Sequence, residues 1–231
     1  MRTYKIVKPI ESITLTPSEM ALAKKCNQAG KIAWSGAAKN ISTFVHGDID
    51  KRKKLKAKIK RNLRKNQQNY CYYCGIDFSF LRNEDVNSHI DHFYPKGAPH
   101  RFYERFVLET MNLVLSCSIC NGLGMKGEND YGINHYASIS RVGSTIIHPY
   151  FDDITEHFKI NEESGVIDFI NKDKTKAELT EKIFKLNKKA QIRARLGDIL
   201  VEQKEIKDAN RTSAEAAKRS IPLQGRTASR I

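Results

Sequence analysis

The chain has 231 residues, enough for one large domain or for a small core domain with helical flanks. Its 40 lysines and arginines outnumber 26 acids, and the formal net charge of +14 favours a polyanionic partner, with nucleic acid as the first candidate. No stretch approaches the ~20 apolar residues of a membrane-spanning helix, and no secretory or lipidation signal is found. A soluble, cytoplasmic protein without membrane association is therefore expected.

The N-terminal region, residues 1–69, is expected to be helical. Thr16-Pro17-Ser18-Glu19 has the form of a capping box with proline at the first helical position, so a helix should begin there. A second helix is expected from about Asp50 to Asn69 because apolar residues recur every four positions. These apolar residues are Leu55, Ile59 and Leu63.

The second helix is strongly basic, with ten cationic residues among the fifteen from Lys51 to Lys65. A solvated helix face is the ordinary explanation of a charge run. No acid is interleaved here, however, and such density repels itself unless an anion lies nearby, which favours a surface that tracks phosphates. The residues of this helix assigned to nucleic-acid binding are Lys51, Arg52, Lys53, Lys54, Lys58 and Arg61.

Residues 70–150 contain two Cys-x-x-Cys pairs, Cys71/Cys74 and Cys117/Cys120. Thiolates with this spacing can present four sulfurs to one tetrahedral Zn²⁺ at about 2.3 Å. Disulfides are the alternative in an exported chain, but the missing leader and the odd fifth cysteine, Cys26, argue against export. We expect a closed, structural Cys₄ zinc site, and we expect Cys26 to be a small buried apolar residue.

Two strands are expected beside this site. The first, residues 87–93, carries His89, Asp91 and His92, and alternation puts His89 and Asp91 on one face and His92 on the other. The second, residues 112–116, leads into the second cysteine pair and Asn121, which should open a helix. Zinc binding would draw these segments together, so that Asp91, His92, Asn112 and Asn121 are able to converge.

The C-terminal region, residues 151–231, is expected to be helical with a polar tail. Residues 175–205 are rich in helix formers, with apolar residues on one helical face. From Asp208 onward few large apolar groups remain, and this tail is expected to be flexible or to order only on a partner.

The four converging polar residues offer the parts that phosphodiester hydrolysis needs. Carboxylate and amide oxygens are hard ligands that suit Mg²⁺ or Mn²⁺, which neutralise charge as it develops. His92 suits the general base that activates water, because the reference pKa of histidine is about 6.5.

The arrangement resembles the HNH endonucleases with the ββα-metal fold. The resemblance covers roughly residues 71–126 and rests on Cys71-x-x-Cys74, Asp91-His92 with Pro95-Lys96, Asn112-Leu113 and Cys117-x-x-Cys120-Asn121. It implies an α+β protein with a zinc-stapled ββα-metal core at residues 70–150 between the two helical regions. The implied function is metal-dependent cleavage of DNA, with RNA as the other possible substrate.

Residue roles follow from the resemblance. It implies Asp91 and Asn121 as ligands of a catalytic Mg²⁺ or Mn²⁺, His92 as general base, and Asn112 as the residue that orients His92. Many relatives carry histidine at the last place, so this is a His-Asn-Asn variant. Four residues separate Asn121 from Lys126, where many relatives have two. Lys96 and Lys126 complete the set assigned to nucleic-acid binding.

Further motifs resemble the HNH proteins of Septu-type and retron-associated anti-phage systems. They are His89-Ile90-Asp91-His92-Phe93-Tyr94-Pro95-Lys96, His148-Pro149-Tyr150 with Glu156-His157-Phe158, and Leu186-Asn187. This likeness implies a role in antiviral defence beside an ATPase partner.

Several of these residues also fit a second role. His89 is either a third metal ligand or a strand residue hydrogen-bonded across the sheet, and Asn112 and Asn121 are also common as turn or knuckle caps. Trp34 is expected in the core, and a platform for base stacking is the alternative. His100, His135, His148 and His157 are expected to be structural or surface groups. The alternative functions are a non-catalytic zinc-ribbon protein that binds nucleic acid and a nuclease subunit that is inactive without its ATPase partner.

Overall fold

The computed structural model describes residues 7, 9–35, 39–81, 83–97, 101–122, 124–170 and 174–219. In this part of the chain the protein has the expected α+β composition, with helices and two small antiparallel sheets. The helices are α1 (Pro17–Ala29), α2 (Asp48–Asn66), α3 (Glu84–Asn87), α4 (Ser118–Asn121), α5 (Lys174–Phe184) and α6 (Lys189–Arg219). The strands are β1 (Ser88–His92), β2 (Leu113–Cys117), β3 (Phe158–Ile160) and β4 (Ile167–Phe169). His100 lies outside the described residues.

None of the helices in the described segments combines the length and the apolar character that a membrane crossing requires.

Helix α1 begins at the expected capping box. The Glu19 backbone N–H donates to the Thr16 hydroxyl at 3.3 Å, and the Thr16 N–H donates to the Glu19 carboxylate at 2.8 Å. These reciprocal bonds satisfy backbone donors that the first turn leaves unpaired. Helix α1 contacts α2 and the 3₁₀ segment Arg101–Phe106.

Helix α2 buries the expected apolar stripe, because Leu55, Ile59 and Leu63 are each at most 2 % exposed. It packs against β2, and the Gln67 side chain at its end completes the contact. The Gln67 amide donates to the Leu115 carbonyl at 2.7 Å and accepts from the Leu115 N–H at 2.8 Å, so it pairs with the free edge of β2 as a neighbouring strand would.

Strands β1 and β2 form one antiparallel pair, with Ser88 opposite Cys117 and His92 opposite Leu113. All five residues of β2 are buried. The helix expected after β2 is a single turn: α4 ends at Asn121 and the chain leaves it at Gly122. The glycines that follow explain this early end, since glycine in a helix interior costs up to about 1 kcal/mol relative to alanine.

The C-terminal region differs from the continuous helix that periodicity suggested. Lys185 has a left-handed backbone, with φ of 52°, and separates α5 from α6. The Asn187 side chain at the break accepts from the Ile167 N–H at 2.8 Å and donates to the Ile167 carbonyl at 2.9 Å, which ties it to β4. The β3–β4 hairpin was not expected, because its three-residue strands are too short to give a periodic signal.

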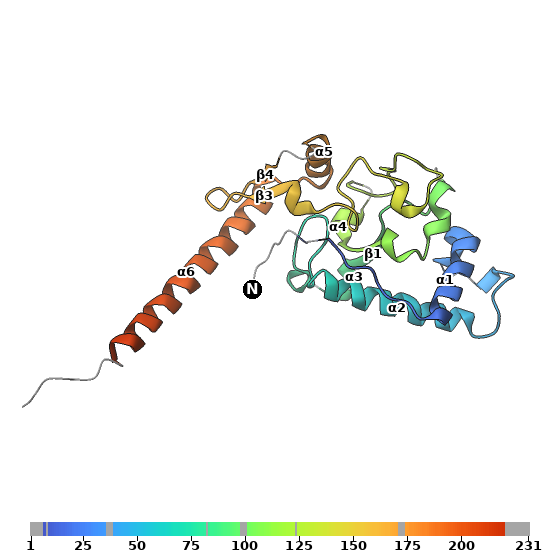
Figure 1. The fold of residues 1–231 in the computed structure, drawn as a ribbon, viewed down its shortest axis with the longest axis horizontal. Helices are drawn as coiled ribbons and strands as arrows, with labels where there is room; N and C mark the ends of the chain where they lie inside the picture. The colour runs from blue at the N-terminus through green and yellow to red at the C-terminus, as the bar shows by residue number, and fades with distance from the viewer. Residues whose placement is uncertain are drawn as a thin grey trace, which may run out of the picture.

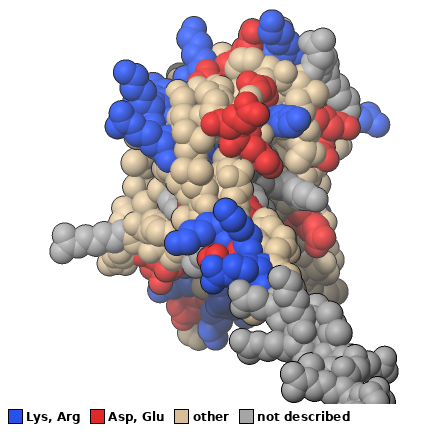
Figure 2. All heavy atoms as spheres, turned by 90° about the vertical axis from the view of Figure 1, so that its left-hand side faces the viewer, with Lys and Arg blue, Asp and Glu red and all other residues tan. Residues whose placement is uncertain are grey.

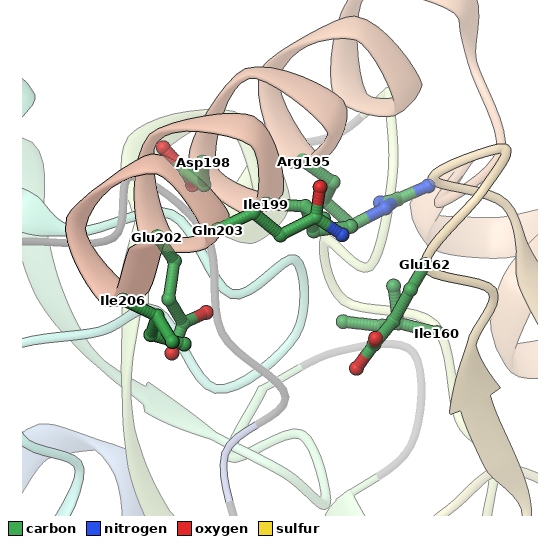
Figure 3. Close-up of a pocket in the computed structure, with 8 residues that line it drawn as sticks. All are labelled: Ile160, Glu162, Arg195, Asp198, Ile199, Glu202, Gln203 and Ile206. Carbon is green, nitrogen blue, oxygen red and sulfur yellow. The ribbon is translucent and has the colours of Figure 1, made fainter. Parts of the chain in front are cut away.

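The hairpin packs against the beginning of α6. Arg195, which is 3 % exposed, donates from Nε to the Gly165 carbonyl at 2.6 Å and from Nη2 to the Leu186 carbonyl at 2.8 Å. A groove lies between β3 and this part of α6, with isoleucines and carboxylates along it (Figure 3). None of the residues assigned to the site by sequence lines this groove.

Beyond the hairpin, α6 extends away from the rest of the protein, whereas α1 and α2 lie at the other end (Figure 1). The tail expected to be flexible from Asp208 is helical as far as Arg219. The helix continues because its Ala, Lys, Arg and Glu residues favour helix even without packing partners.

Candidate active site and metal centre

The four paired cysteines form one compact cluster. Their Sγ atoms all lie within 4.8 Å of one another, and the Cys74 and Cys117 sulfurs are 3.9 Å apart. Four sulfurs about 2.3 Å from a central tetrahedral Zn²⁺ are separated by about 3.8 Å, so the cluster has the size of a Cys₄ zinc site. Among the described residues this is the one group of three or more His, Cys, Asp or Glu side chains that could hold a metal.

The backbone around the cysteines is shaped for thiolates. The Cys117 N–H donates to Cys71 Sγ at 3.3 Å and the Cys120 N–H donates to Cys117 Sγ at 3.4 Å. Hydrogen bonds from Cys120 and the other cysteines hold the pKa of Cys117 well below its usual range. Gly75 follows the first pair with φ of 73°, a conformation that glycine adopts without strain. The isolated Cys26 is fully buried and outside the cluster, and burial raises its pKa to about 11.

A polar pocket of about 240 Å³ lies at the end of β1. Asp91, His92 and Asn121 line it together, with Lys96 and Glu128 beside them. Alternation had put Asp91 and His92 on opposite faces of the sheet. Both nevertheless border the same pocket, and they are the last two residues of β1.

His92 is a buried, neutral histidine with one nitrogen fixed. Its Nε2 lies 3.0 Å from the Val107 carbonyl oxygen, and because a carbonyl only accepts, Nε2 carries the proton and Nδ1 the lone pair. The side chain is 3 % exposed, and Nδ1 has no hydrogen-bond partner within the described residues. Burial, followed by the charge of Lys96, lowers the pKa of His92 well below the usual range. The ring is therefore neutral at neutral pH.

Asp91 is held by two donors. Its Oδ2 accepts from the Tyr73 hydroxyl at 2.5 Å and lies 3.2 Å from Lys126 Nζ. The Lys126 side chain is fully buried and also donates to the His92 carbonyl at 2.7 Å. Lys126 was assigned to a phosphate contact, and the structure corrects this, because its ammonium is enclosed beside Asp91 and compensates that charge.

Loss of this compensation is expected to be costly. Lys126→Met should lower the free energy of unfolding by about 3–5 kcal/mol, because it leaves the Asp91 carboxylate buried without a cation. Urea denaturation followed by circular dichroism measures the change. Lys65→Met, at an exposed position on α2, is the control and should change stability by less than about 0.5 kcal/mol. Equal stability of the two variants would show that the Lys126 ion pair carries no stabilisation.

Asn112 is fully buried, but it does not bind His92 directly. Its Oδ1 accepts from the Tyr94 N–H at 2.7 Å, and its Nδ2 donates to the Tyr94 and Phe106 carbonyls at 3.1 and 3.2 Å. The amide thus joins the loop after β1 to the segment that ends at Val107. His92 Nε2 contacts the Val107 carbonyl, and Asn112 binds the neighbouring Phe106 carbonyl.

The oxygens of Asp91 and Asn121 fit a hard cation. Asp91 Oδ1 has a single long contact, 3.5 Å from Lys126 Nζ, so it keeps an unused lone pair. The half-buried Asn121 amide makes no hydrogen bond within the described residues. Both could act as ligands of Mg²⁺ or Mn²⁺. His89 is exposed and does not line the pocket, which disfavours it as a third ligand.

No known protein-family model matches this chain. A comparison with curated proteins finds no significant match. The functional assignment therefore depends on the residues themselves.

The basic residues of α2 are less available than their sequence suggested. Acids from other segments neutralise several of them: Lys58 lies 2.6 Å from Glu19, and Arg64 lies 2.9 Å from Glu84. Arg52 was assigned to nucleic-acid binding, but it is 5 % exposed and donates to the Ala33 and Trp34 carbonyls. Its role is structural, because a buried guanidinium needs acceptors for its donors.

The remaining assigned cations of α2 lie mainly in a groove between α1 and α2. Lys51, Lys54, Lys58 and Arg61 line it. Elsewhere the surface charge is mixed: on the face seen in Figure 2, lysines and arginines are interspersed with acids and do not form one continuous basic area. The groove, the exposed Lys53 and the half-buried Lys96 are the parts of the assigned surface that stay open to an anion, with Lys58 in the groove paired to Glu19.

Trp34 and Lys56 lie next to His92 and were not assigned to the site by sequence. The Trp34 ring packs against His92 with 4.4 Å between centroids and 83° between planes, and Lys56 Nζ lies 3.8 Å from the centre of the indole. Trp34 was expected in the core, and it is half-buried. Trp34 stands out in the sequence as the sole tryptophan of the chain. That feature does not indicate which residues surround it in the fold.

Proposed function

We propose that this protein is a metal-dependent endonuclease of the HNH type that hydrolyses phosphodiester bonds in DNA. The observation that carries the proposal is the state of His92: a buried neutral imidazole with Nε2 fixed on Val107 and Nδ1 without a partner among the described residues. His148 Nε2 and His157 Nδ1 also lack a partner among the described residues, but of these three histidines only His92 lines the polar pocket at the end of β1. It stands in one pocket with a carboxylate and an amide, Asp91 and Asn121.

In the proposed reaction His92 acts as general base. Its Nδ1 takes a proton from water, the hydroxide oxygen forms a bond to phosphorus, and the bond from phosphorus to the 3′-oxygen breaks. The low pKa keeps the imidazole unprotonated before the reaction. The negative phosphate offsets the nearby charge of Lys96, which makes the imidazole a stronger base when the substrate is bound.

The other residues support this step. Asp91 and Asn121 would hold a Mg²⁺ or Mn²⁺ ion, which when bound neutralises charge on the phosphate and on the leaving oxygen. Lys126 limits the net negative charge around Asp91. The β1–β2 pair with α4 would correspond to a ββα-metal core, with zinc at the four cysteines as its staple.

Plasmid cleavage tests the proposal. The purified protein is expected to nick or linearise supercoiled DNA in the presence of Mg²⁺ or Mn²⁺, and EDTA should stop the reaction. Zinc content is measured before and after EDTA, so that loss of the structural metal is told apart from loss of the catalytic one. Tight, salt-sensitive binding without any cleavage would favour a non-catalytic zinc-ribbon protein.

A further inference from the structure

Trp34 places an aromatic ring against His92 of the pocket and near two lysines from separate segments. It follows the 3₁₀ turn Gly30–Ala33, and its edge-to-face contact with His92 fixes the indole beside the imidazole. Lys56 comes from the middle of α2, and Lys96 comes from the loop after β1, where it also lines the pocket. Lys56 of α2 is thus connected to the pocket through the Trp34 indole, which contacts both Lys56 and His92.

Both ammonium groups lie near this ring. Lys56 Nζ lies 3.8 Å from the ring centre and donates to the Trp34 carbonyl at 3.0 Å. Lys96 Nζ lies 5.9 Å from the same centre. Among the described residues neither lysine has an acidic partner within ion-pair distance, in contrast to Lys58 and Arg64 on the same helix.

This arrangement carries a cost in the free protein. The pKa of Lys56 is lowered to about 8, chiefly by burial and then by the charges of Arg52 and Lys96. Burial is also the main cause of the lowered pKa of Lys96. Contact with the indole face offsets part of this cost. At Lys96 the charges of Asp91 and Glu128 offset a further part, whereas the charge of Lys126 adds to the cost. An anion beside both ammonium groups would offset their desolvation and the repulsion that Lys56 experiences from Lys96.

We propose that Lys56 and Lys96, held by Trp34, form a subsite for one phosphate of a nucleic-acid backbone, next to the bond that His92 hydrolyses. This inference rests on the proposed function and names the residues that position its substrate. A backbone phosphate offers two non-bridging oxygens, so each ammonium can take one through a charge-assisted hydrogen bond. The site is assigned to a phosphodiester in a chain and not to free phosphate, because Lys96 lines the same pocket as Asp91 and His92.

The sole tryptophan allows a direct test without catalysis. A short DNA duplex is titrated into the full-length protein in EDTA-free buffer without added Mg²⁺, and the fluorescence of Trp34 is followed. Lys56→Met and Lys96→Met keep an apolar side chain and remove one charge each. Each is expected to weaken binding about tenfold and to reduce the slope of log affinity against log salt by about one. Lys65→Met, exposed on the same helix, should change affinity less than about twofold.

The outcomes separate this inference from the proposed function. Unchanged affinity and salt slope in both lysine variants, or no binding that perturbs Trp34, would overturn the subsite even if the protein cleaves DNA. Weakened binding in a protein that does not cleave would uphold the subsite and overturn the nuclease. Inorganic phosphate is titrated in parallel, and a response as strong as that to the duplex would overturn the assignment to a nucleic-acid chain. Zinc content and melting temperature show that the variants are folded.

Discussion

Cys120→Ser is expected to release zinc and to unfold the region around β1, β2 and the two cysteine turns. A two-stranded sheet is marginal by itself in water, and here β1 and β2 are joined to both turns that carry the sulfurs. Structural zinc contributes about 10–16 kcal/mol of apparent binding energy in small metal-dependent domains, which is as large as the whole stability of an ordinary domain. The measurements are zinc per chain by elemental analysis and thermal unfolding by circular dichroism.

Cys26→Ala is the matched control for this prediction. Cys26 is as buried as Cys71, but it lies on α1 outside the cluster. Its replacement should leave one zinc per chain, with a modest loss of stability from the smaller side chain. If Cys120→Ser kept both zinc and the wild-type melting temperature, the cluster would not be a metal staple.

His92→Ala is expected to lower the rate of DNA cleavage by about 10²–10⁴-fold, the usual contribution of a positioned general base. The change removes the unpaired Nδ1 without touching Asp91, Asn121 or the cysteines. Zinc content should stay close to wild type, because no cysteine contact depends on the imidazole. DNA affinity is measured alongside, because the imidazole also packs against Trp34. Single-turnover cleavage of a labelled duplex measures the effect on the chemical step.

His89→Ala provides the comparison on the same strand. Its side chain is exposed and lies outside the pocket, so cleavage should proceed at nearly the wild-type rate. If both variants lost DNA cleavage, the cause would be damage to β1 and not the missing general base. A wild-type rate in His92→Ala, with zinc bound, would falsify the proposed mechanism.

The local elements were largely predictable because short-range physics determines them. The capping box at Thr16 needs only residues three apart, and the Leu55–Leu63 stripe needs only a helical period. The strand that carries Asp91 and the Cys-x-x-Cys spacing are likewise local patterns. For the same reason Asp91, His92 and Asn121 could be assigned to one site before their positions were known.

The tertiary environment of those residues could not be predicted in this way. Lys126 and Arg52 are both basic in sequence, yet each is enclosed because an acceptor from a distant segment faces it. The acids that neutralise basic residues of α2 come from α1 and α3. The lack of acids within residues 51–65 therefore did not mean that these basic residues lack acidic partners. Trp34 reaches His92 in a turn that packs on α1 and whose Trp34 carbonyl accepts from Arg52 and Lys56 of α2. Such pairings depend on the fold and leave no periodic trace.

The length of α6 has a geometric consequence. Its 31 residues span about 46 Å at 1.5 Å per residue, which is more than the width of a small domain. The Arg195 contacts anchor the near end, and the far end points away from the remaining helices (Figure 1). A molecule captured at that far end would not touch the pocket. Its effect on the pocket would be that of a tether: a nucleic acid attached to that molecule would have a higher local concentration near the pocket.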